Sequence, residues 1–320
     1  ILNLDPNSHL ARTALEYAIN NSMTNVLDKL IEKLSTSDNE ESQSWAEVYR
    51  IDREVVKGNL SLIEATNKLT YMNCETKELN VLRMILQLYN YYDLKCIDML
   101  GTLCELVNAA IAELSEGFMK RSLITRLGLA MQGVHLHLNQ LDESRDYGNS
   151  VLKNAISDKA KGVALRNLGN SYIIEDREKS IYFLTASKEI FYNIHQHFEL
   201  SFSQRSLNFV YCYWNQPEKY SKTSPFNAVD EKHGNAYYYI KKNEFKSAVK
   251  ILDEVKKGIC NDFQLGFNYY YRGLITNSED CFFEAIKHFK KAGDFYFRRL
   301  PLIELKKLGV NNIIIETLSI

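Results

Sequence analysis

The sequence has few of the residues that interrupt helices. It contains only 4 prolines and 14 glycines among 320 residues, and both residue types break or punctuate regular elements. Their scarcity favours long helices joined by short turns. The sequence also lacks an apolar run near the ~20 residues that a transmembrane helix requires. We therefore expect a soluble protein with no membrane partner.

Cysteine is also sparse, with six residues and no CxxC pair. No signal peptide precedes them, so reduced thiols in the cytoplasm are favoured over a secreted disulfide framework. The net charge of −1 gives no electrostatic signature of a nucleic-acid-binding surface. Composition therefore favours a cytoplasmic protein and gives no indication that this chain itself binds nucleic acid.

The common catalytic and cofactor motifs are missing as well. The sequence has no GxGxxG, GxxxxGK[ST], GxSxG or HExxH motif, each of which would supply a phosphate cradle, a nucleophile or zinc ligands. His135 and His137 are two residues apart, so on a helix they point about 200° apart and cannot share a metal ion. Adjacent acids such as Asp142 and Glu143 fall at polar helix starts, where they act as caps. We predict a protein that is not an enzyme and holds no cofactor or metal.

Hydrophobic residues recur with a helical period almost everywhere. The run from Ile313 to Ile315 is the only stretch that resembles a strand, and its position at the end of a helical array favours a capping turn or helix. Two of the four prolines lie in 215–227, which predicts a longer loop. We expect helices near 8–20, 23–35, 42–57, 60–69, 76–91, 94–110, 114–139, 141–155, 158–174, 176–193, 197–215, 228–242, 243–257, 261–276, 278–293 and 296–308.

An internal repeat organises these helices. The residues Leu165, Leu168, Gly169 and Tyr172 follow the L–LG–Y spacing that is typical of the first helix of a tetratricopeptide unit. Small residues recur 36 or 37 positions apart, from Gly133 to Gly169 and from Ala236 to Gly273, close to the tetratricopeptide period of about 34. The predicted fold is all-α, a tetratricopeptide-like helical repeat superhelix (α-solenoid) with C-terminal capping helices.

Three regions follow from the repeat pattern. We expect degenerate N-terminal helical repeats in 1–113, peptide-binding repeats in 114–295 and a capping and dimerisation segment in 296–320. A helical-repeat array presents a concave surface, which suits an extended peptide.

Polar residues flank the buried stripe of the readable repeat. Arg166 and Asn170 lie four residues apart on one flank of this helix. Asn208 has the same position relative to the buried stripe of a later helix, which consists of Leu207, Val210, Tyr211 and Trp214. An Asn amide can donate to a carbonyl and accept from an N–H of a bound peptide, and an Arg can pair with a carboxylate. The spacing is equally compatible with ordinary solvated positions on a helix flank.

Several segments together resemble one known family. They include ARTALEYA at 11–18, ELNVLRMILQLY at 78–89, ALRNLGNSYI at 164–173 and RRLPLIELKKLG at 298–309. This combination is similar to the arbitrium peptide receptors (AimR) of Bacillus temperate phages, which belong to the peptide-sensing tetratricopeptide regulators of Firmicutes. The resemblance extends over nearly the whole chain.

The resemblance implies a homodimeric transcription regulator in the cytoplasm of a bacterial host, which controls the lysis–lysogeny decision. It implies a short signalling hexapeptide, usually ending in Arg-Gly-Ala, that shifts the receptor away from its operator DNA through differential affinity for two states. DNA binding would reside in an N-terminal domain absent from this chain. The resemblance places dimer contacts in 296–320, at Leu302, Leu305, Leu308, Ile313 and Ile314.

The resemblance also implies peptide-binding residues. Arg166 and Asn170 would meet the peptide's carboxylate, and Asp294 would meet its amino end. Asn268 is a weaker candidate for the groove wall. If Gly273 is the small residue that packs against the neighbouring helix, Asn268 does not fall on the concave side of its own helix. The remaining candidates for the groove wall are Asn167, Asn208 and Tyr237.

Two alternatives belong to other functional classes. The first is a peptide-regulated response-regulator phosphatase, which would require a catalytic side chain in an N-terminal helical bundle, and we identify none. The second is a tetratricopeptide scaffold for a protein partner.

Overall fold

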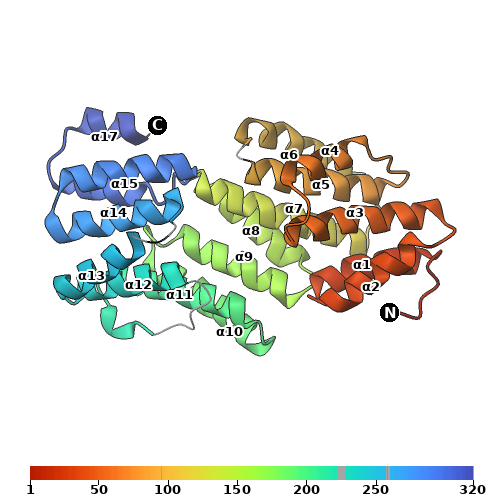
Figure 1. The fold of residues 1–320 in the computed structure, drawn as a ribbon, viewed down its shortest axis with the longest axis horizontal. Helices are drawn as coiled ribbons and strands as arrows, with labels where there is room; N and C mark the ends of the chain where they lie inside the picture. The colour runs from red at the N-terminus through yellow and green to blue at the C-terminus, as the bar shows by residue number, and fades with distance from the viewer. Residues whose placement is uncertain (95, 222–227, 257, 259, 320) are drawn as a thin grey trace. The chain divides into compact units, whose positions relative to one another are not determined.

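The computed structural model describes residues 1–94, 96–221, 228–256, 258 and 260–319. Throughout these residues the chain forms helices and no β-strand (Figure 1), as the hydrophobic period predicts. The chain divides into two compact units, the first comprising residues 1–131 and 149–161, and the second residues 132–148 and 162–320. The functional division expected between residues 113 and 114 stays a prediction.

The helices follow one another with short connections (Figure 1). Those that begin in the first unit are α1 (His9–Asn20), α2 (Thr24–Ser35), α3 (Glu40–Val56), α4 (Leu62–Tyr71), α5 (Lys77–Asp93), α6 (Ile97–Ala112), α7 (Phe118–His137) and α9 (Asp158–Ser171). Those that begin in the second unit are α8 (Leu141–Asn154), α10 (Arg177–Asn193), α11 (His197–Tyr213), the 3-10 turn η1 (Pro217–Lys219), α12 (Ala228–Lys241), α13 (Phe245–Lys256), α14 (Asp262–Thr276), α15 (Glu279–Ala292), α16 (Arg299–Lys307) and α17 (Asn312–Ser319).

Side-chain caps fix several helix starts. The Asp176 carboxylate accepts from the Lys179 N–H at 3.0 Å, and the Ser278 hydroxyl accepts from the Cys281 N–H at 3.5 Å. Such caps satisfy backbone donors that have no partner inside the helix. Asp142 lies one position inside α8 rather than before it, so its expected role as a cap was wrong.

Close helix approach explains two of the four small repeat residues. A Cβ on Gly169 would meet Leu184 Cγ at 2.6 Å, and a Cβ on Gly273 would meet Phe282 Cε1 at 2.5 Å. Gly133 does not mark such an approach, because no described atom lies within 4 Å of the position that its Cβ would take. The close approach occurs instead at Gly148, whose Cβ would meet the Gln132 amide at 2.3 Å.

A buried ion pair joins α1 and α7 in the first unit. Glu16 is fully buried and accepts from Arg126 Nε at 2.8 Å and Nη2 at 3.0 Å. The hydroxyls of Tyr49 and Ser122 also donate to this carboxylate. Burial alone would raise the pKa of Glu16, but the charge and hydrogen bonds of Arg126 outweigh it and lower that pKa. Glu16 is therefore an ionised and fully partnered acid.

Aromatic rings dominate the core of the second unit. Phe267 lies 5.9 Å from Phe209, 5.1 Å from Phe289 and 5.1 Å from Phe297, measured between ring centroids. Edge-to-face ring pairs of this kind add stability beyond the apolar area that they bury. The cluster joins helices α11, α14 and α15. Phe209, Phe267 and Phe297 also line a cavity that contains polar side chains.

Candidate functional site

A cavity of about 400 Å³ lies in the second unit among α9, α11, α12 and α14. Its apolar lining comes from the aromatic core, including Phe209, Phe267 and Phe297. Its polar lining includes Asn170, Arg205, Asp230, Glu231 and His233. An apolar cavity with a few convergent polar groups is the usual form of a ligand site.

Four polar side-chain atoms in this lining are buried and have no hydrogen-bond partner among the described residues. They are Asn170 Oδ1, Arg205 Nη2, Glu231 Oε2 and His233 Nε2. A buried polar atom without a partner costs about 1–3 kcal/mol, and native structures contain few of them. Their concentration in one cavity makes it the candidate site for a polar ligand.

Arg205 on α11 is the cation of the cavity. One guanidinium nitrogen lies 3.3 Å from the Asp230 carboxylate, and the guanidinium stacks 4.2 Å from the Phe202 ring centroid. Burial lowers the pKa of Arg205, and the charge of Asp230 opposes this effect. The stacking and the ion pair fix the position of the guanidinium. Its Nη2, which has no partner among the described residues, can donate to an anionic group.

His233 and Glu231 lie on α12, on the same cavity wall. His233 is 5% exposed, and burial lowers its pKa to about 4. The imidazole is therefore neutral at physiological pH. Glu231 adds a carboxylate oxygen without a partner. With Arg205 and Asp230, the cavity offers one cationic and two anionic side chains.

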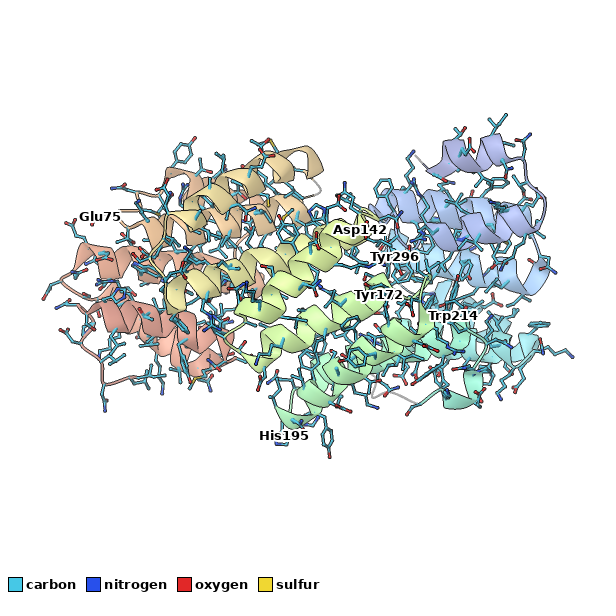
Figure 2. The ribbon with its side chains drawn as sticks, turned by 180° about the vertical axis from the view of Figure 1, so that it is seen from behind. Glu75, Asp142, Tyr172, His195, Trp214 and Tyr296 are labelled. Atoms are coloured by element: carbon cyan, nitrogen blue, oxygen red, sulfur yellow. The ribbon has the colours of Figure 1, made fainter. Side chains whose placement is uncertain are left out.

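Three of the residues expected from the sequence line this cavity. They are Asn170, Asn208 and Tyr237. Figure 2 labels Tyr296. Its hydroxyl donates to the backbone carbonyl of Asn170 at 2.7 Å and holds the end of α9 in place. Asn208 uses its amide within the chain, because it donates to the Ser221 carbonyl at 2.6 Å and accepts from the Ser221 N–H at 3.1 Å. The peptide-like pairing expected for Asn208 is therefore made with the protein's own backbone.

Arg166 and Asn167 do not line the cavity. Arg166 forms an ion pair with Glu199 on α11, and its guanidinium lies 5.3 Å from the Phe202 ring centroid. Asn167 donates to the Gln132 side chain at 3.4 Å. In this structure both side chains join helices of the second unit to one another.

Asn268 and Asp294 also lie outside the cavity lining. Asn268 is fully buried, donates to the Leu252 carbonyl at 3.0 Å and accepts from Arg272 at 2.9 Å. Asp294 is 4% exposed and accepts from the Phe297 N–H at 2.7 Å. Both side chains make internal contacts, and the register conflict noted for Asn268 is explained by its complete burial.

The sequence interpretation missed Arg205, Glu231 and His233. Arg205 precedes Asn208 by three residues, and residues three apart are neighbours on a helix surface. That spacing could have identified Arg205 once Asn208 was a candidate. Glu231 and His233 follow the proline-containing segment and carry no repeat signature that would have marked them.

The residues expected at the dimer contact fall into two groups. Leu302 and Leu305 belong to the aromatic core of the second unit, at 8% and 0% exposure. A direct surface role for these two was therefore wrong, because their side chains already pack inside the protomer. Leu308, Ile313 and Ile314 are exposed, at 39%, 71% and 47%. The run at Ile313–Ile315 is helical, as predicted.

The described residues contain neither a metal-binding cluster nor a membrane-spanning helix. No group of three or more His, Cys, Asp or Glu side chains there could hold a metal ion. None of the described helices is both long and apolar enough to cross a bilayer.

The described residues form a helical-repeat protein with a candidate ligand cavity in its second unit. The family model for AimR transcriptional regulator-like proteins matches residues 1–307. The chain therefore belongs to this family.

Characterised relatives span the whole chain. The AimR transcriptional regulator of Bacillus phage phi3T is 28% identical over 322 residues, covering 100% of this chain and 83% of the relative. The AimR transcriptional regulator of Bacillus phage SPbeta is also 28% identical, covering 99% of this chain and 81% of the relative. Both relatives are named as regulators of transcription.

Solved structures agree with the fold. The structure of SeMet-phAimR matches with a TM-score of 0.86 at 28% identity, covering 100% of this chain and 82% of that one. A structure of phAimR with a ligand matches with a TM-score of 0.79 at 28% identity, covering 96% and 90%. The all-α helical-repeat fold predicted from the sequence is confirmed.

Proposed function

We propose that this chain is the sensing part of a peptide-responsive transcription regulator, and that the cavity lined by Arg205 and His233 binds the peptide. The observation that carries the proposal is the set of four buried polar atoms without partners. A short peptide has the complementary groups, because its carboxylate can accept from Arg205 and its N–H groups can donate to Glu231 and Asn170. His233 can accept or donate, according to its tautomer.

Charge supports a ligand that carries both signs. Arg205 suits the C-terminal carboxylate of a peptide, while Asp230 and Glu231 suit a cationic side chain or an amino terminus. A hexapeptide ending in Arg-Gly-Ala, as the family resemblance implies, has a carboxylate two residues beyond a guanidinium. The volume of about 400 Å³ is within the usual range for ligand cavities.

Regulation would follow from a population shift. If the peptide binds one state of the receptor more tightly than the other, it moves the equilibrium toward that state in proportion to the difference in affinity. We propose that the favoured state no longer binds operator DNA, and that this release controls a lysis–lysogeny decision. A homodimer joined through Leu308, Ile313 and Ile314 would transmit the shift between protomers.

The binding claim is tested by calorimetric titration of the chain with hexapeptides. The panel contains sequences ending in Arg-Gly-Ala, the same sequences with an amidated C-terminus, and scrambled controls. We expect binding to the free-acid peptides and at least tenfold weaker binding after amidation, because Arg205 loses its carboxylate partner. If no member of a varied panel binds, the peptide proposal is wrong.

A further inference from the structure

A second, smaller cavity lies elsewhere in the second unit, at the ends of α11 and α12. It has a volume of about 230 Å³, and its lining includes Tyr213, Trp214, Lys241 and Tyr270. Tyr237 lines both this cavity and the larger one. Figure 2 shows Trp214 at the end of α11. Neither the repeat pattern nor the proposed peptide function explains these side chains.

Lys241 is the unusual residue of this cavity. It ends α12, is half-buried, and makes no ion pair or hydrogen bond within the described residues. Its ammonium nitrogen lies 5.5 Å from the centroid of the Tyr237 ring. Burial lowers the pKa of Lys241, and the nearby charge of Glu304 only partly opposes this effect.

The acid in the lining compensates Lys241 only in part. Glu304 on α16 pairs with Lys307, whose ammonium nitrogen lies 2.8 Å from the carboxylate. The lining therefore holds two cations and one anion. A single negative charge would balance the cavity and give Lys241 a charge-assisted hydrogen bond.

The remaining walls are aromatic. The rings of Tyr213 and Trp214 meet edge to face with centroids 5.6 Å apart, and Tyr270 adds a buried phenol. Such walls favour a flat ring, which can stack on them or meet them edge to face. The Trp214 indole N–H donates to the Ile173 carbonyl at 2.9 Å, so the position of this ring is fixed before any ligand arrives.

We propose that this cavity binds a small monocarboxylate that carries an aromatic ring. The carboxylate pairs with Lys241, and the ring packs against Tyr213 and Trp214. This site is separate from the proposed peptide function and does not depend on it.

Intrinsic fluorescence tests the proposal, because the chain has only two tryptophans. Trp45 lies in the first unit and is 3% exposed, so W45F leaves Trp214 as the sole reporter. The probes are sodium benzoate, its neutral analogue benzamide, and phenyl phosphate. We expect a saturable change with benzoate and at least tenfold weaker binding of benzamide, because the amide carries no charge for Lys241.

Variants in the W45F background separate the charge from packing. Lys241→Met keeps an apolar stem against Tyr237 and should weaken benzoate binding about tenfold, whereas Lys241→Arg should stay within threefold. Lys246→Met removes one exposed lysine of the neighbouring α13 and should leave the affinity unchanged.

Several results would overturn the proposal. They are equal binding of benzoate and benzamide, full affinity in K241M, no saturable signal, or tighter binding of phenyl phosphate than of benzoate. The comparison of benzoate with benzamide decides the question even if K241M does not fold.

Discussion

The two units each bury a cluster of polar side chains, and the clusters differ in how completely their hydrogen bonds are satisfied. In the first unit, Glu16 accepts from Arg126 twice and from two hydroxyls. In the second unit, the cavity retains polar atoms without partners on Arg205, His233 and two other residues. A complete network stabilises one arrangement of helices, whereas an incomplete one has hydrogen-bonding capacity left for a ligand.

This difference separates structural polar residues from ligand-binding ones by a physical criterion. Burial and charge alone do not make the distinction, because both clusters contain a partly buried arginine beside a carboxylate. The number of satisfied donors and acceptors does, since each unsatisfied buried atom costs stability that a bound ligand would restore.

The largest effect is expected at the first unit's ion pair. Arg126→Met leaves the buried Glu16 carboxylate without its counter-charge and should lower the free energy of unfolding by about 3–5 kcal/mol. Chemical denaturation measures this loss. The double variant E16L R126M removes both charges and should recover most of the stability. A double variant as unstable as R126M would contradict the assignment of the pair as a structural unit.

The next effect concerns pH and the second unit. Because burial lowers the pKa of His233 to about 4 from 6.5, the fold holds this imidazole neutral, and protonation opposes folding. Stability is therefore retained above pH 6.5 and lost as the pH falls toward 4, by about 3 kcal/mol in total from this group. Arg205, Asp230 and Glu231 line the same cavity and will modulate the size of this loss.

Denaturation curves at several pH values test this prediction. H233Q removes the titrating group. Between pH 6.5 and 4 its free energy of unfolding should therefore fall by about 3 kcal/mol less than that of wild type. If wild type and H233Q lose stability in parallel, His233 is not the responsible group.

A smaller effect is expected on the exposed surface of the second unit. Ile313 and Ile314 are large apolar side chains on α17 with high exposure, and burying such a side chain is worth about 1.5–3 kcal/mol. If they form a dimer contact, Ile313→Asp should shift the chain toward monomer in sedimentation experiments. Ile63→Asp, at a comparably exposed position of the first unit (62% against 71% for Ile313), serves as the control and should leave the association unchanged.

The smallest effect is expected at Arg166. Its ion pair with Glu199 is partly exposed, with both side chains between 16% and 19% accessible, and such pairs contribute about 1 kcal/mol or less. Arg166→Met should change peptide affinity by less than threefold, because this side chain does not line the cavity. A larger loss of affinity in calorimetry would place Arg166 in the site, as the sequence suggested.

The sequence predicts the helices well because their signal is local. Hydrophobic period and capping residues such as Asp176 and Ser278 act within a few positions. Predicting the site was harder, because each polar residue's role depends on a partner supplied by another element. Glu199 engages Arg166, Ser221 engages Asn208, and Leu252 engages Asn268, and helix periodicity specifies none of these pairings.

The same limit explains the capping segment. A stripe of leucines near the C-terminus predicts an apolar face but does not say what covers it. Leu302 and Leu305 face the protomer's own core, whereas Ile313 and Ile314 remain exposed. Which apolar face is covered within the protomer depends on the packing of α15, α16 and α17.

The role of Arg205 as the carboxylate partner can be measured by calorimetric titration of Arg205→Met with a binding hexapeptide that ends in Arg-Gly-Ala. We expect an affinity at least tenfold lower than wild type, since the carboxylate loses a charged hydrogen bond worth about 1.5–3 kcal/mol. We also expect unfolding stability close to that of wild type, because the Arg205 network is incomplete before the ligand binds. Wild-type affinity in a folded Arg205→Met variant would contradict the claim that the unsatisfied cluster is the ligand site.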